Sequence, residues 1–274
     1  MSGAIERVVV RLDAASETHA AIETAARLAA RAKAPLHGVF VEDEDLLNLA
    51  GLPFARQVTL GAGAERITTK EAELHLRAAA EAARKELAAA AKRHRIDCSF
   101  EIVRGNAATP LSFASSGDLI VAGGLSRPVA GHFRIEARWW SAVQVAPGPL
   151  LLVRHAGGAR GGVVVLLRKR NAAASRLIEA AAQIAHAADS ALTIISPQAV
   201  AGAKGFQKWL ADRLGGLPVR LTVEVAPDEP AALQRRIAEL DCRLLAIEAG
   251  FAEGGGDQLR QLVERFACDI LIAR

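Results

Sequence analysis

Short apolar runs alternate with longer amphipathic stretches along the whole chain. Arg7–Leu12 is almost continuously apolar, which is typical of a strand buried on both faces of a parallel sheet. From Ser16 to Ala32 the apolar residues instead return at helical spacing and form one face, with Ser16 as a candidate N-cap. Strands that alternate with helices require right-handed crossovers, and hence a parallel sheet with helices on both faces. The pattern therefore predicts an α/β fold.

The same alternation continues to residue 154. Residues 42–64 are expected to be irregular, and their apolar run Leu46–Phe54 has two interpretations: a flap over a pocket, or a local core under the following long helix. The elements expected after the first helix are a strand at 35–41, a long helix at 65–95, a strand at 98–103, a short helix at 109–115, a strand at 119–122, a glycine-bearing loop, a helix at 135–145 and a strand at 150–154.

The chain then repeats itself. Val8-Val9-Val10 and Ile22-Glu23 recur as Val164-Val165-Leu166 and Ile178-Glu179, in both cases 156 residues later. We therefore expect two tandem domains, residues 1–156 and 161–274, each built on a doubly wound, parallel, five-stranded sheet. The elements expected in the second copy are strands at 162–167, 192–196, 219–225, 243–247 and 270–273, and helices at 172–188, 203–214, 230–240 and 257–266.

The composition argues against nucleic-acid binding, a disulfide framework and membrane insertion. A net charge of +4 over 274 residues is too small for a nucleic-acid surface, and the densest basic run, Lys92–Arg95, is interpreted as the last turn of a helix. The three cysteines show no CxxC spacing and are expected to be buried free thiols. Because neither a signal peptide nor a long apolar stretch is found, we expect a cytoplasmic protein without a membrane partner if the host is bacterial.

Common catalytic signatures are missing from the sequence. It contains no GxxxxGK[ST] phosphate loop and no GxSxG nucleophile elbow, and its seven histidines are not spaced as metal ligands. No residue is therefore assigned a catalytic role, and neither a metal ion nor enzymatic turnover is expected.

Five segments, taken in order, carry a resemblance to a known family. They are Val8–Asp13, His37–Val41, Val103–Asn106, Asp118–Gly124 and Ala146–Arg154. In this order and at these separations the chain resembles the universal stress proteins, in a tandem form with two domains in one chain. The resemblance implies an adenine-nucleotide α-hydrolase-like fold with strand order 3-2-1-4-5 in each domain. It also implies an internal pseudo-dimer with the last strands near its two-fold axis, and it is compatible with a homodimer.

The resemblance further implies a nucleotide site in the first copy, with ATP or AMP as candidate ligands. Members that bind ATP carry an aspartate after strand one, matched by Asp13, and a glycine loop after strand four, which Gly123 and Gly124 begin here. Val39 and Val41 would line an adenine slot. Asp13 has an alternative role as a turn or N-cap residue.

The phosphate loop departs from the family pattern. Ser126-Arg127 stands where the second glycine is expected, and Glu136-Ala137 stands where the family has glycine followed by serine or threonine. Arg127 would offset phosphate charge, but the triphosphate cradle is expected to be lost. In the second copy Lys169 replaces the aspartate, and Gly256-Asp257 more simply begins a helix, so we expect no nucleotide there.

Two functions remain open at this point. The first is a stress-response sensor or regulator that binds an adenine nucleotide or similar small anion through Asp13, Val39, Val41, Gly123, Gly124 and Arg127. The second is a scaffold or interaction protein that keeps the fold without the site. The adjacent Trp139 and Trp140 are expected at an interface, because neighbouring helix positions point about 100° apart.

Overall fold

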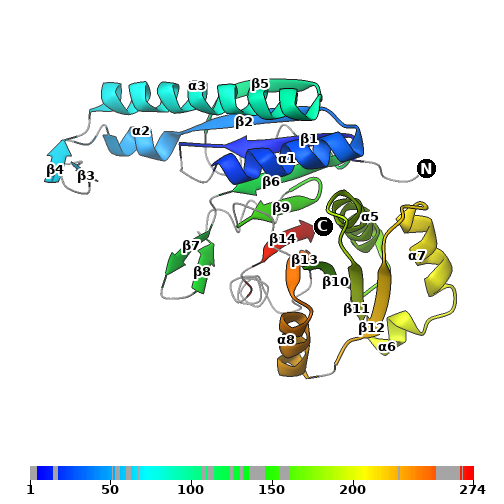
Figure 1. Ribbon diagram of the computed structural model, residues 1–274. Helices are drawn as coiled ribbons and strands as arrows, with labels where there is room; N and C mark the ends of the chain where they lie inside the picture. Colours follow the sequence, from blue (N-terminus) through cyan, green and yellow to red (C-terminus); the bar gives the residue numbers. More distant parts are fainter. Residues whose placement is uncertain are drawn as a thin grey trace.

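One continuous ten-stranded sheet forms the centre of the molecule (Figure 1). In the computed structural model the described residues are 5–14, 18–50, 52, 56–59, 63–66, 68–105, 109, 114–123, 126–129, 132–135, 146–154, 161–227, 229–250, 266 and 268–274.

The strand order in the two halves of the sheet is the same. Counting strands along the chain, each half has the order 3-2-1-4-5, and all pairs within a half are parallel, as expected. The first half runs β5 (Cys98–Gly105), β2 (Leu36–Asp43), β1 (Arg7–Leu12), β6 (Asp118–Gly123) and β9 (Leu150–Val153). The second half runs β12 (Leu221–Val225), β11 (Leu192–Ser196), β10 (Gly162–Leu166), β13 (Cys242–Glu248) and β14 (Asp269–Ala273).

The two halves are joined edge to edge by their last strands. β9 pairs with β14 in antiparallel orientation, with Leu151 opposite Leu271. The two expected five-stranded sheets are therefore halves of a single sheet rather than separate layers. The physical reason is that each last strand would otherwise leave an unpaired edge, and pairing the two edges satisfies both backbones.

Helices cover both faces of this sheet. On one face α1 (Thr18–Ala32) packs between α3 (Thr69–His94) and α5 (Ala172–Ala187), so one apolar core extends across both halves. α7 (Phe206–Leu214) completes this layer, and α6 (Gln198–Ala201) precedes it. The second core lies on the opposite face under α8 (Pro230–Glu239), whose Ile237 is fully buried.

Residues 42–64 are more regular than the sequence predicts. They contain α2 (Glu44–Ala50) and the hairpin strands β3 (Arg56–Thr59) and β4 (Gly63–Arg66). Leu47 and Ala50 of α2 pack against Ala72 and Leu76 of α3, which favours the local-core interpretation over the flap. α3 begins later than expected, because Thr68 forms a capping box with Glu71.

The segment after β6 also differs from the prediction. β7 (Ser126–Val129) and β8 (His132–Ile135) form an antiparallel hairpin where a loop and the start of a helix at 135 were expected. In β8 polar and apolar residues alternate, from His132 to Ile135, which is a strand pattern rather than a helical one. Trp139 and Trp140, and residues 257–265 of the helix expected at 257–266, lie outside the described residues.

Two smaller predictions have opposite outcomes. The basic run is the last turn of α3, where Arg93 forms an ion pair with Glu23 of α1, as interpreted. Cys98 is exposed rather than buried, because it begins the edge strand β5. Among the described residues, no helix is long and apolar enough to cross a bilayer.

Candidate functional site at the carboxyl edge of the first half

The strand order of the first half reverses next to β1. β1 lies between β2 and β6, and Arg11 is aligned with Val39 on one side and with Ala122 on the other. Parallel strands end at the same edge, and ligands of open α/β sheets bind where the order reverses. Asp13, which directly follows β1, is therefore placed at this edge, as the sequence predicts.

Asp13 forms an ion pair with Arg11, through its Oδ2 and the guanidinium Nη1. The Asp13 side chain is 26% exposed and that of Arg11 is 10% exposed, so the pair lies at the surface with the cation beneath the acid. Thr18, the first residue of α1, donates its hydroxyl to the Asp13 carbonyl oxygen at 3.3 Å. The end of β1 therefore combines a hydrogen-bond acceptor, the Asp13 carboxylate, with a cation, the Arg11 guanidinium. The hydrogen bond from Thr18 ties the Asp13 main chain to the start of α1.

Arg11 was not selected as a site residue from the sequence. The signal is nevertheless present, because Arg11 interrupts a buried apolar strand two residues before Asp13. Residues i and i+2 of a strand point to the same face, which brings the two charges together. A cation in that place offers a direct contact for an anionic ligand.

Val39 and Val41 lie on the same face of the sheet as Arg11. Phe40, between the two valines, points into the core under α1, so Val39 and Val41 point to the opposite face. Both valines are buried, and their backbones belong to β2, which pairs with β1 and β5. The two valines thus form an apolar floor beside Arg11.

The glycine end of the candidate site is described only in part. Gly123 is the last residue of β6 and is aligned with Val153 of β9. Gly124 lies outside the described residues. Arg127 has its backbone in β7, opposite Arg134 of β8. The hairpin therefore occupies the sequence position of the expected phosphate loop.

The equivalent edge of the second half is built differently. Asn171 accepts from the Ala174 amide at 2.7 Å and so caps α5, and its side-chain amide donates to Glu248 Oε2 at 3.0 Å. Glu248 is only 7% exposed, and its carboxylate stands beside β10 at the point where this half reverses its order. A buried carboxylate there repels phosphate. Lys169, which replaces the aspartate, and Arg170 lie in the same connection.

Neither edge shows the requirements of a metal centre. Among the residues that the structure describes, no three His, Cys, Asp or Glu side chains are grouped closely enough to hold an ion. The chemistry that the described residues of the first edge offer is hydrogen bonding and charge pairing.

Comparison with solved structures identifies the fold. A universal stress protein from Archaeoglobus fulgidus DSM 4304 superposes with a TM-score of 0.63 over 97% of this chain and 98% of its own, at 12% identity. The chain has the universal stress protein fold. A putative universal stress protein from Pseudomonas aeruginosa UCBPP-PA14 gives 0.60 over 98% and 93%, at 17% identity.

The same fold occurs in a different molecular context. The cytoplasmic domain of a prokaryotic cation chloride cotransporter superposes with a TM-score of 0.53 over 97% of this chain and 94% of its own, at 12% identity. No protein-family model and no curated protein matches the sequence. The universal stress protein fold thus rests on the structure, and the role of the site rests on its residues.

Proposed function

We propose that the chain is a tandem universal stress-type protein that binds a small adenine nucleotide at the carboxyl edge of its first domain. That domain comprises residues 1–156, and residues 161–274 form a second domain that acts as a built-in dimer partner. The Arg11–Asp13 pair, placed beside the reversal of strand order, is the observation that carries this proposal. The protein would act as a cytoplasmic stress-response sensor, without turnover.

Each part of the edge has a separate task in this proposal. Asp13 accepts hydrogen bonds from ribose hydroxyls, and Arg11 attracts the anion. The floor at Val39 and Val41 packs against the base. Gly123 and Gly124 allow the backbone to approach a phosphate, and Arg127 adds positive charge.

A monophosphate suits this edge better than a triphosphate. The β7–β8 hairpin stands where a glycine loop would surround the β- and γ-phosphates, and its four-residue strands are paired with each other. Backbone amides that are paired in a hairpin ladder are not available to phosphate oxygens. We therefore expect AMP to bind more tightly than ATP.

Isothermal titration of the full chain with AMP and ATP tests the proposal. Asp13→Asn should weaken AMP at least tenfold, because the amide no longer provides a charged acceptor. Asp97→Asn is the matched control, since Asp97 is an exposed aspartate at the opposite edge of the same half. If Asp13→Asn binds AMP as well as the unmodified chain, the assignment of the site is wrong.

The scaffold function remains the second candidate, and one observation favours it. Glu248 and the β7–β8 hairpin occupy the two places where nucleotide phosphates would be expected. If neither nucleotide binds at millimolar concentration while the circular dichroism spectrum shows a folded chain, the scaffold function replaces the sensor.

A further inference from the structure

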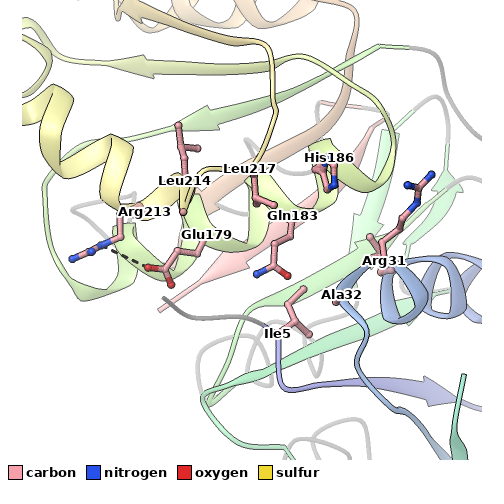
Figure 2. Close-up of a pocket in the computed structure, with 11 residues that line it drawn as sticks. Ile5, Arg31, Ala32, Glu179, Gln183, His186, Arg213, Leu214 and Leu217 are labelled. Carbon is pink, nitrogen blue, oxygen red and sulfur yellow. Dashed lines mark ion pairs between the residues drawn. The ribbon is translucent and has the colours of Figure 1, made fainter. Parts of the chain in front are cut away.

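A cavity of about 240 Å³ lies between the two halves of the molecule, away from the carboxyl edge (Figure 2). Its walls come from Ile5 before β1, the last turn of α1, one side of α5, and the end of α7 with the chain that follows it. Ile5 and Asp13 are eight residues apart along the central strand, which corresponds to about 25 Å. The cavity is therefore separate from the proposed nucleotide site.

Apolar side chains make up one part of the lining. Ile5 and Leu28 are buried on the side of the first half, and Leu214 and Leu217 lie on the side of the second half. Figure 2 shows Ile5 and Ala32 across the cavity from α5, whose Gln183 points toward them. An apolar ligand group enclosed here would touch both halves at once.

Positive charge dominates the polar part of the lining. The lining includes two arginines, Arg31 and Arg213, and one acid, Glu179, and Figure 2 shows both guanidinium groups at its outer ends. Glu179 already pairs with Arg213, its Oε1 lying 3.6 Å from Nε. Burial of Glu179 raises the pKa of its carboxyl group, and the charge of Arg213 opposes this shift.

Arg31 and His186 supply the unused polar groups. Within the described part of the chain, neither side chain forms a hydrogen bond or an ion pair. Arg31 is exposed at the end of α1, and His186 is partly buried in the last turn of α5. A guanidinium beside an apolar cavity matches a carboxylate group attached to an apolar body, because its planar fork donates hydrogen bonds to both carboxylate oxygens.

We propose that this cavity binds a small amphipathic monocarboxylate, with its apolar part between Ile5 and Leu217 and its carboxylate at Arg31. The volume of the cavity is below that of pockets that bind drug-sized ligands, so a short aliphatic acid or a single-ring acid fits. Because the walls belong to both halves, the bound acid stabilises the junction. This inference does not depend on the nucleotide proposal.

Titration of the full chain with hexanoate and phenylacetate tests the proposal, with binding followed by calorimetry and by the thermal midpoint. Both acids should bind saturably and raise the midpoint. Hexanamide, which has the same chain without charge, should bind at least tenfold more weakly, and acetate should not bind. Equal binding of hexanoate and hexanamide would overturn the assignment of an anionic ligand.

Three variants locate the site. Arg31→Gln should weaken hexanoate at least tenfold, and Ala32→Phe should abolish binding by filling the cavity. Arg235→Gln is the matched control, because Arg235 is an exposed arginine on α8, on the opposite face of the sheet. Arg31 is exposed, so its variant should fold even if Ala32→Phe does not. Hexanoate binding that is unchanged in Arg31→Gln, or absent from the unmodified chain, would refute the proposal.

Discussion

Leu151 and Leu271 lie directly opposite each other in the antiparallel pair that joins the two halves of the sheet. Around them Leu150 is aligned with Ile272, and Leu152 with Ile270. Adding 120 to a residue number in β9 gives the equivalent residue of β14, so Leu150 corresponds to Ile270 and Leu152 to Ile272. Leu150 therefore pairs with the equivalent of Leu152, and Leu152 with the equivalent of Leu150, as expected for an isologous contact around a two-fold axis. The pseudo-two-fold axis that relates the two last strands therefore passes between these two leucines.

Coupling between Leu151 and Leu271 follows from this position. Each leucine is about 99% buried or more, so Leu→Ala at either one should cost about 2–5 kcal/mol of unfolding free energy. The double variant should lose less than the sum of the two, by at least about 0.5 kcal/mol, because opposite residues share one contact. Urea unfolding of the two single variants and the double variant measures this difference.

Leu87 provides the control for this cycle. It is buried on α3 above β2, three strands from β9, and it shares no strand contact with Leu151. Leu151→Ala and Leu87→Ala should therefore be additive within about 0.5 kcal/mol. Additivity of the Leu151 and Leu271 substitutions would mean that the two halves are not coupled through their last strands.

Gly148 is required for the close approach of the chain that leads into β9. A Cβ atom at this residue would lie 2.4 Å from the Asp118 carbonyl oxygen and 2.8 Å from that of Ser115. Both are main-chain atoms, so Gly148→Ala should cost about 1–3 kcal/mol through overpacking. Thermal unfolding checks this against Gly250→Ala, where a Cβ meets no atom within 4 Å. Equal stability of the two variants would contradict the predicted clash.

Stability should depend on pH through Glu224 of β12. Arg236 of α8 donates to both carboxylate oxygens, at 2.7 and 2.8 Å, and this bonding lowers the pKa of Glu224 below its ordinary 4.5. The stabilisation is thus complete above pH 4.5 and is lost as the pH falls through the lower, folded-state pKa. Because water screens the pair, Glu224→Gln should cost only about 0.5 kcal/mol at pH 7.

The comparison of Glu224→Gln with the unmodified chain should be made at pH 7 and near pH 3. The difference in unfolding free energy should become smaller at the lower pH, because Glu224 is increasingly protonated as the pH falls toward its lowered folded-state pKa. Glu239→Gln is the control, since Glu239 accepts a single bond from Arg236 and is more exposed. A difference of the same size at low pH would show that packing, not charge, is responsible.

Duplication in the sequence predicted much of the fold correctly. Ile22-Glu23 and Ile178-Glu179 are related by the 156-residue repeat, and Glu23 pairs with Arg93 of α3 just as Glu179 pairs with Arg213 of α7. The relation between α1 and α3 is thus repeated between α5 and α7. The strand order in each half is likewise as the family resemblance implied.

Tertiary contacts explain what the sequence did not predict. Nothing local in β9 or β14 specifies that the two edges pair, because that contact joins residues 120 apart in the chain. The Arg11–Asp13 ion pair was not predicted, since it depends on both side chains pointing to the same side of the chain at the end of β1. Glu248 was overlooked because its bond to Asn171 spans 77 residues.

Backbone chemical-shift mapping with AMP tests the central proposal most directly. In a ¹⁵N-labelled full chain, saturating AMP should shift the amide signals of Asp13, Val41 and Gly123 and leave those of Lys169 and Glu248 unchanged. The shifts should vanish in Asp13→Asn. Shifts confined to the second half, or none at millimolar AMP, would contradict a nucleotide site at the carboxyl edge of the first half.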